Sequence, residues 1–379
     1  MKRISILVLI LCACFASVAW GQQPASKVCN DWREFHRPDM TRFNPCEKTL
    51  NVHNVGNLSL LWSYTTGLWV YSSPAVANGV VYVASYDGNL YALNASTGAK
   101  LWSYPAGLYV WSSPAVANGV VYVGGAYYDY NVYALNASTG ALLWSYGTSG
   151  QVISSPAVVN GVVYVGSEDN NVYALNASTG ALLWSYTTGG SVYSSPAVAN
   201  GVVYVGSDDN NVYALNASTG AKLWSYTTGD VVYVSSPAVA NGVVYVGSLD
   251  HNVYALNAST GALLWSYTTG SNVSSSPAVA NGVVYVGSDD RKVYALKAST
   301  GALLWHHVTD QDVISSPAVA NGVVYVGSLD HNVYALNAKT GVKLWRYDTS
   351  KQVWSSPAVS NGVVYVGSNN GNVYAFGLK

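Results

Sequence analysis

Seven aspartates recur at one position of a repeated turn, and their type and spacing suggest binding chemistry. They are Asp87, Asp129, Asp169, Asp209, Asp250, Asp290 and Asp330. Acidic side chains gathered on one surface would attract cationic partners or divalent ions and steer their approach. A tight turn also favours Asp, because the Asp side chain accepts backbone amides two residues further on. We favour the turn interpretation for any single aspartate and keep the binding face as the alternative.

Aromatic residues form a second candidate set. Trp69, Tyr71, Tyr109, Trp111 and Trp354 each lie within a few residues of a following Ser-Ser-Pro-Ala motif. Such a group beside acidic turns could stack a sugar, a quinone or a peptide side chain. Packing between neighbouring repeats also explains these residues, and we favour packing. Replacing the three tryptophans with alanine separates the two hypotheses, since only packing predicts a fall in melting temperature.

The sequence carries no motif of a familiar catalytic or metal centre. It has no Ser-His-Asp context, no Walker loop, no His-Glu-x-x-His and no EF-hand spacing. His251 and His331 occupy isolated turn tips, which does not suit a zinc site. We therefore assign no catalytic, cofactor-binding or metal-ligating residue.

The composition excludes several classes of protein. The 379 residues include 17 Lys and Arg against 18 Asp and Glu, so the formal net charge is −1. Only 9% of residues are charged and 50% are hydrophobic, which excludes a disordered chain and a coiled coil. The charge balance also lacks the basic footprint of nucleic-acid binding.

The first 21 residues read as a secretory signal peptide. Lys2 and Arg3 precede an apolar run, and Ala19-Trp20-Gly21 offers a small-x-small cleavage site. Leu11-Cys12-Ala13-Cys14 resembles a lipoprotein cleavage box, so lipid attachment at Cys14 is an alternative. We expect an exported protein, periplasmic or extracellular, with outer-membrane anchoring as the lesser alternative and no transmembrane segment.

Residues 22–57 form an N-terminal extension before the repeats. Cys29 and Cys46 are the two cysteines that remain after the leader. In an oxidising compartment we expect them to form a disulfide, because this segment offers too few ligands for a metal.

From residue 58 to residue 379 one unit of 40–42 residues is repeated eight times. Its markers are the proline of Ser-Ser-Pro-Ala and the tryptophan of Leu-Trp. The tryptophans are Trp62, Trp102, Trp144, Trp184, Trp224, Trp265, Trp305 and Trp345. A period near 40 with several short strands predicts an all-β propeller of eight blades, each of four antiparallel strands A to D. We expect each indole to dock its blade on the next.

The ends of the repeat region predict how the ring closes. A D-type strand at residues 60–64 precedes the first A strand, whereas the last unit stops after its C strand at residues 373–376. The N-terminal strand can therefore complete blade eight and leave no open edge. In the unit that starts at Ser194 we expect strands at 194–199, 202–206, 212–215 and 223–226.

Residues 92–102 resemble the tryptophan-docking motif of pyrroloquinoline quinone (PQQ) propellers, Ala-x-Asp-x-x-Thr-Gly-x-x-x-Trp, with Asn94 at the Asp position. Six further copies follow, and Asp31–Phe35 resembles an entry segment of the family. The resemblance implies the propeller fold. The family includes dehydrogenases that hold PQQ and Ca²⁺ in the central channel beneath a vicinal Cys-Cys ring, which this chain lacks. It also includes non-enzymatic relatives such as the propeller lipoprotein of the outer-membrane assembly machinery.

Divergence among the repeats is concentrated in the B–C and D–A connections, which share one face of a propeller. All 14 acidic residues after residue 50 lie there, whereas Lys100, Lys222, Lys297, Lys339 and Lys343 lie toward the opposite face. We predict a monomeric, exported, non-catalytic scaffold that binds a protein or other macromolecule through the acidic face, with no cofactor. The alternatives are a PQQ- and Ca²⁺-dependent dehydrogenase of alcohols or sugars, and a multivalent carbohydrate-binding propeller.

Overall fold

The computed structural model describes residues 29, 31–125 and 127–379. The expected signal peptide and the alternative lipid attachment at Cys14 lie outside the described residues. Within them, no helix has the length and apolar character needed to cross a membrane.

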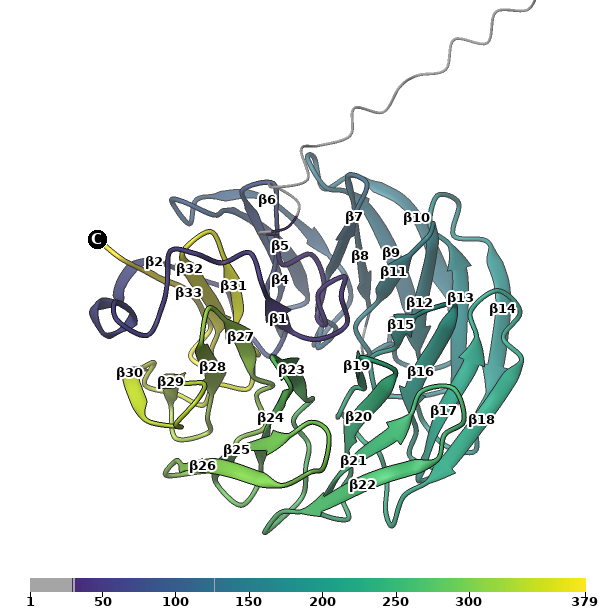
Figure 1. Ribbon diagram of the computed structural model, residues 1–379. Helices are drawn as coiled ribbons and strands as arrows, with labels where there is room; N and C mark the ends of the chain where they lie inside the picture. Colours follow the sequence, from purple (N-terminus) through teal and green to yellow (C-terminus); the bar gives the residue numbers. More distant parts are fainter. Residues whose placement is uncertain (1–28, 30, 126) are drawn as a thin grey trace, which may run out of the picture.

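The described chain forms a ring of eight blades, each with four antiparallel strands, which confirms the predicted propeller (Figure 1); β1 adds a short fifth strand to blade seven. The innermost strands (A) are β3 Ala75–Ala77, β7 Ala115–Ala117, β11 Ala157–Val159, β15 Ala197–Ala199, β19 Ala238–Ala240, β23 Ala278–Ala280, β27 Ala318–Ala320 and β31 Ala358–Ser360. The second strands (B) are β4 Val80–Ala84, β8 Val120–Gly124, β12 Val162–Gly166, β16 Val202–Gly206, β20 Val243–Gly247, β24 Val283–Ser288, β28 Val323–Gly327 and β32 Val363–Gly367.

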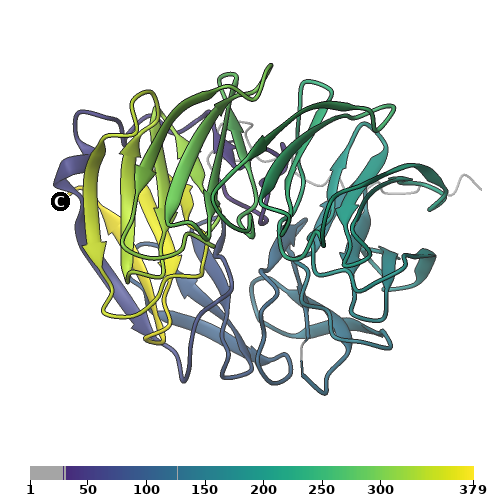
Figure 2. The ribbon, with the colours of Figure 1, turned by 90° about the horizontal axis from the view of Figure 1, so that it is seen from below.

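The third strands (C) are β5 Asn89–Asn94, β9 Asn131–Asn136, β13 Asn171–Asn176, β17 Asn211–Asn216, β21 Asn252–Asn257, β25 Lys292–Lys297, β29 Asn332–Asn337 and β33 Asn372–Gly377. The outer strands (D) are β6 Lys100–Pro105, β10 Leu142–Gly147, β14 Leu182–Thr187, β18 Lys222–Thr227, β22 Leu263–Thr268, β26 Leu303–Val308, β30 Lys343–Asp348 and, for blade eight, β2 Ser59–Thr65. Seen from the side, the sheets pack face to face with loops at both ends (Figure 2). The middle strands are therefore buried on both faces, as their unbroken apolar runs predict.

The first long strand closes the ring as predicted. Strand β2 pairs antiparallel with β33, from Ser59 opposite Gly377 to Thr65 opposite Asn372. Blade eight therefore combines one strand from the start of the repeat region with three from its end. This pairing gives β33 a neighbour on both sides and removes an exposed edge.

Each Leu-Trp indole lies against the blade that follows. The Trp62 Nε1–H group donates to the Ala95 carbonyl of blade one at 2.9 Å, and the other seven indoles make the equivalent bond. The ring of Trp62 covers Gly98, where a Cβ atom would lie 2.7 Å from the indole and φ is +72°. The Thr-Gly of the repeat therefore provides both a left-handed turn and a flat seat for the indole.

The inner strands are shorter than the sequence suggests. In blade four the expected strand at 194–199 begins only at Ala197. Pro196 has no amide hydrogen, and the Ser195 amide donates to the Ser236 hydroxyl of the next blade at 2.8 Å. The Ser-Ser-Pro segment therefore joins blades to one another instead of extending the sheet.

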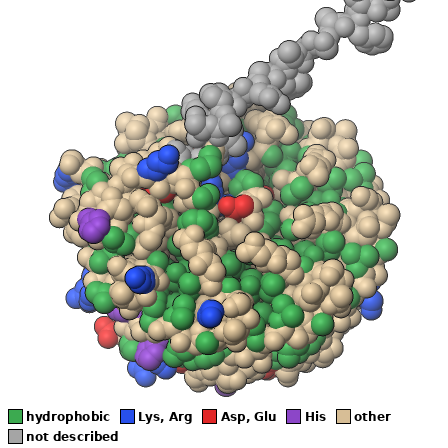
Figure 3. Space-filling view, viewed as in Figure 1, with side chains coloured by type: hydrophobic (Ala, Val, Ile, Leu, Met, Phe, Trp, Pro, Cys, Tyr) green, Lys and Arg blue, Asp and Glu red, His purple; other side chains and the backbone are tan. Residues whose placement is uncertain are grey.

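The described residues of the N-terminal extension cross one face of the ring, where Figure 1 shows them in purple. They contain β1 Phe43–Asn44, which runs parallel to β27, and the 3₁₀ turn η1 Val55–Asn57. Cys29 and Cys46 are joined by a disulfide. Asn321 Nδ2–H donates to the Leu50 carbonyl at 2.9 Å, and the Gly362 amide donates to Glu47 at 2.8 Å, so the covered face is that of the A–B turns. Figure 3 shows this face, where Lys and Arg side chains are more widespread than Asp and Glu.

Candidate functional site

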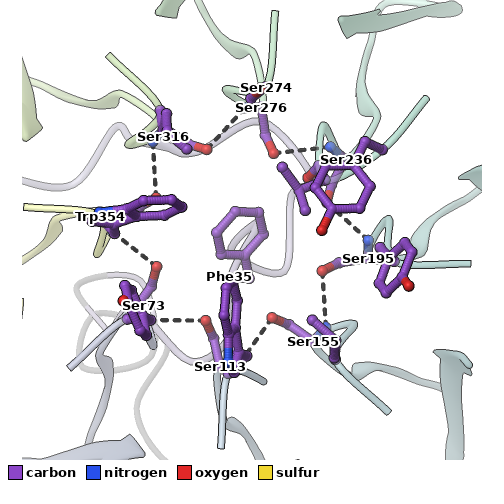
Figure 4. Close-up of a pocket in the computed structure, with 18 residues that line it drawn as sticks. Phe35, Ser73, Ser113, Ser155, Ser195, Ser236, Ser274, Ser276, Ser316 and Trp354 are labelled. Atoms are coloured by element: carbon purple, nitrogen blue, oxygen red, sulfur yellow. Dashed lines mark hydrogen bonds between the residues drawn. The ribbon is translucent and has the colours of Figure 1, made fainter. Parts of the chain in front are cut away.

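The central channel is sealed at one end by a segment of the extension, residues 31–44, which we call the plug. The plug bonds to the inner strands of seven blades. Its partners are Val76, Val116, Val158, Val239, Val279, Val319 and Val359. Phe35 stands at the centre of the channel and forms its floor (Figure 4). The opposite mouth, formed by the D–A and B–C connections, is therefore the end from which a ligand can enter.

A ring of serine hydrogen bonds surrounds this floor (Figure 4). In every blade the second serine of Ser-Ser-Pro-Ala donates its amide to the hydroxyl of the equivalent serine in the next blade. The amide of Ser356 in blade eight donates to Ser73 in blade one at 3.0 Å, which completes the circle. The residues just before these serines are held in register around the channel.

Above the floor the channel encloses a cavity of about 290 Å³. Its walls are largely aromatic and apolar. They include Tyr71, Trp111, Ile153, Tyr193, Tyr233, Ile314 and Trp354. Three of the five aromatic candidates from the sequence therefore line it, and the polar groups at this depth are serine hydroxyls. Such a cavity suits a group with an extended, flat surface.

The aromatic candidates also contact one another across blades eight, one and two. Tyr71 stacks on Trp111 with ring centroids 4.7 Å apart and makes a T-shaped contact with Trp354 at a centroid distance of 5.2 Å. Tyr86, which the sequence analysis did not select, joins Trp69 to Tyr109 at centroid distances of 5.5 and 4.2 Å. Packing and an accessible aromatic surface therefore coexist, because Trp69 remains 46% exposed.

The seven recurrent aspartates do not point into the cavity as a set. The Asp169 carboxylate accepts the Asn171 amide at 3.0 Å, the Tyr173 hydroxyl at 2.7 Å and the Ser149 amide at 2.9 Å. The same three types of bond are made by Asp87, Asp209, Asp250 and Asp330. Related bonds to a tyrosine hydroxyl and to neighbouring polar groups are made by Asp129 and Asp290. All of these carboxylates except that of Asp129 join the B–C turn to the preceding D–A connection.

Replacing Asp169 with alanine should lower stability by about 1–3 kcal/mol, because three donors lose their acceptor. Asp169→Asn should cost less. In blade eight Asn370 fills the same position, accepts the Asn372 amide at 3.0 Å and lies 2.6 Å from the Tyr374 hydroxyl. Urea denaturation of the two variants measures the difference. Equal stability of wild type and both variants would contradict the structural role.

The residue immediately before each recurrent aspartate lies at the channel mouth, and its type differs from blade to blade. In blades four and six it is Asp208 and Asp289, which the sequence analysis counted only as part of the acidic face. Asp289 accepts the Ser274 hydroxyl of the cavity wall at 3.3 Å. Burial raises the pKa of each carboxyl to about 6, helped by Asp209 beside Asp208 and by Asp312 beside Asp289. The mouth thus holds carboxylates whose charged form is disfavoured by burial and by neighbouring carboxylates.

Glu168 of blade three extends this acidic arc. The pKa of Tyr193, which lines the cavity, is raised to about 12 by burial first and by the charge of Glu168 next. The acidic arc therefore faces the aromatic sector of blades eight, one and two around the same mouth. A comparison of the repeats at this single turn position would have identified the acidic arc from the sequence.

The cavity residues do not fit PQQ, which is a tricarboxylate. Carboxylates are bound by Arg or Lys, and the described residues that line the cavity include neither. Asp208 and Asp289 would repel the cofactor. Across the described part of the chain, no three His, Cys, Asp or Glu side chains are grouped to hold a metal ion such as Ca²⁺.

Comparisons with known proteins agree with the fold. The model of the PQQ_2 family, described as outer membrane protein assembly factor BamB, matches residues 57–156, 110–192, 131–276 and 250–379. No curated protein matched the sequence.

Solved structures with the same fold come from proteins of different kinds. BamB from Moraxella catarrhalis is 21% identical with a TM-score of 0.73, over 85% of this chain and 100% of that one. The computationally designed Ika8 protein is 20% identical with a TM-score of 0.76, over 84% and 99%. Quinohemoprotein alcohol dehydrogenase ADHIIG from Pseudomonas putida HK5 is 20% identical with a TM-score of 0.79, over 93% and 81%.

Proposed function

The chain belongs to the PQQ_2 repeat family, and we propose that it is an exported, non-catalytic scaffold whose channel mouth binds a protein partner. The family description, an outer membrane protein assembly factor, supports a protein as the partner. Fold alone does not assign activity, since the same ring occurs in a dehydrogenase and in a designed protein. The function must therefore be inferred from the residues at the channel mouth of this chain.

The observation that carries the proposal is the contrast between the two ends of the channel. The plug covers the end where the A–B turns are nearly invariant. The open end carries the residues in which the blades differ, including the exposed Trp69 and the acidic arc of Glu168, Asp208 and Asp289. Variable loops on a rigid scaffold are the usual place for recognition.

Export is part of the proposal. The Cys29–Cys46 disulfide suits an oxidising compartment, either the periplasm or the extracellular space. The leader sequence supports the same route, and lipid attachment at Cys14 would place the scaffold on a membrane surface.

Crosslinking from the two faces tests the proposal. A photoreactive amino acid at Tyr128, which is 79% exposed beside the mouth, should capture a discrete protein in the envelope of the native cell. The same group at exposed Ser178, in a C–D turn on the opposite face, is the control. Combining Trp69→Ala, Trp111→Ala and Trp354→Ala should remove the adduct at Tyr128. Identical adducts from both faces, or none from Tyr128, would contradict the proposal.

The dehydrogenase alternative is tested separately. Purified protein mixed with PQQ and Ca²⁺ should show neither a bound quinone absorbance nor dye reduction with alcohols. Dye reduction that depends on the cofactor would overturn the assignment.

A further inference from the structure

We propose that the cavity at the channel mouth receives an arginine side chain from a loop of the partner protein. This inference deepens the proposed function and rests on it. The chemistry of the ligand follows from three features of the mouth: its flat aromatic wall, its uncompensated carboxylates, and its acceptor atoms that lack donors.

The aromatic wall provides the surface on which a planar cation stacks. Tyr71, Trp111 and Trp354 line the cavity and come from three adjacent blades. A cation over such rings is attracted to their negative faces. Guanidinium is planar, weakly hydrated and stacks on aromatic rings more readily than ammonium does. This feature therefore favours arginine over lysine.

The carboxylates provide the opposite charge. Burial raises the pKa of Tyr193 and Tyr233 in the cavity wall, and the nearby charges of Glu168 and Asp208 raise it further. Asp289 bonds to Ser274 of the same wall. Among the described residues that line the cavity there is no Lys or Arg to neutralise them. A cation entering the mouth would restore the balance of charge.

Unpaired acceptors are the third feature. Buried side-chain oxygens without a hydrogen-bond donor include Asp208 Oδ1, Asp289 Oδ1 and Asn369 Oδ1. These three residues hold the same B–C turn position in blades four, six and eight. Leaving a buried acceptor unpaired costs free energy, which a ligand rich in donors recovers. Guanidinium carries five N–H donors and no acceptor, so its hydrogen bonding complements this mouth.

Peptide binding to the purified full chain tests the inference. The probe is acetyl-Gly-Gly-Arg-Gly-Gly-amide, and binding is followed at pH 8 by tryptophan fluorescence and calorimetry. We expect saturable binding and an affinity at least about tenfold lower for the citrulline peptide, which keeps the shape but removes the charge. The lysine peptide should bind more weakly than the arginine peptide. Equal binding of the citrulline peptide would overturn the inference.

Charge variants locate the site. Asp208→Asn combined with Asp289→Asn should weaken binding of the arginine peptide about tenfold or more without lowering the melting temperature. The matched control combines Asp169→Asn with Asp250→Asn, which removes two charges from turn positions outside the cavity. If the control weakens binding as much as the mouth variant does, the effect is general electrostatics and the inference fails.

The pH dependence gives an independent readout. Asp208 faces Asp209, Glu168, Tyr193 and Tyr233, and no cation is among the groups that shift its pKa. Protonation near pH 6 removes its charge, so arginine binding should fall as the pH is lowered from 8 to 5.

The groups that act on the other mouth carboxylate are Asp312, Asp290, Ser274 and Asn272, with Lys292 paired to Asp290. Asp289 therefore titrates in the same direction as Asp208. Affinity that stays constant across this pH range would contradict a role for both carboxylates.

Failure of this inference can be told apart from failure of the proposed function. If the photoreactive group at Tyr128 still captures a protein while the arginine peptide does not bind, the scaffold role is retained and the arginine pocket is excluded. Binding of free arginine amide as tightly as the peptide would replace the protein loop with a small cationic ligand.

Discussion

Deleting residues 58–66 should convert the closed ring into an aggregating species. The deletion removes β2, so β33 keeps only β32 as a neighbour and its other edge along Asn372–Gly377 becomes unpaired. It also removes two blade contacts, because Trp62 docks on blade one and the Leu58 carbonyl accepts the Trp345 indole at 3.0 Å. An unpaired strand edge recruits other chains. Light scattering and size-exclusion chromatography measure the outcome.

Trp102→Ala is the matched control for this deletion. It removes one indole contact inside the ring, which should cost about 3–5 kcal/mol, but it leaves every strand paired. This variant should melt earlier and remain monomeric. A soluble monomer of the deletion variant with unchanged melting behaviour would refute closure by β2.

The second large effect is expected from Arg42→Met. The Arg42 side chain is fully buried and its guanidinium donates to the Pro317 carbonyl at 2.9 Å and to the Pro357 carbonyl at 3.1 Å. It also donates to the Phe35 carbonyl and lies 4.5 Å from the Phe35 ring centre. One side chain therefore joins blades seven and eight to the floor of the channel.

Methionine keeps an unbranched apolar side chain but lacks the guanidinium, so these buried carbonyls lose their donor. We expect a loss of about 3–5 kcal/mol of stability and faster hydrogen exchange in the plug. Arg33→Met is the control, because the partly exposed Arg33 side chain pairs with the buried Asp31 and its contact with the inner strands uses only its carbonyl. Because the control breaks one ion pair and leaves the inner-strand contact in place, it should lose less stability than Arg42→Met. Equal melting temperatures for the two variants would contradict a special role of Arg42.

The fold could be predicted from the sequence because the period of the repeat can be read directly from the order of the residues. Repeated Leu-Trp and Ser-Ser-Pro-Ala motifs specify the number of blades, and the unmatched strands at the two ends specify the closure. The true length of the A strands could not be read in the same way. Ser194 and Ser195 have strand-like neighbours, but the Ser194 hydroxyl accepts the Gly206 amide of strand β16 and the Ser195 amide donates to the next blade.

The candidate site was predictable only in part. The aromatic sector of Tyr71, Trp111 and Trp354 follows from motif position, and the structure brings these three residues together. For the aspartates the sequence could not separate Asp169 from Asp208, because both are acidic turn residues. The difference lies in partners supplied by the preceding connection, such as the Ser149 amide. Likewise, no local pattern indicates that Phe35 reaches the centre of a ring formed by residues far along the chain.

The plug also bears on how so regular a ring assembles correctly. Successive blades present nearly the same serines and indoles to one another, so these contacts alone do not distinguish the proper neighbour from another blade. The plug meets the inner strands in chain order, with Trp32 at Val76, Arg33 at Val116 and Arg42 at Val319. Each of these residues of the plug therefore pairs with one particular blade, although the blades are nearly identical in sequence. In a ring with one blade too few or too many, the later residues of the plug would lie opposite the wrong blade.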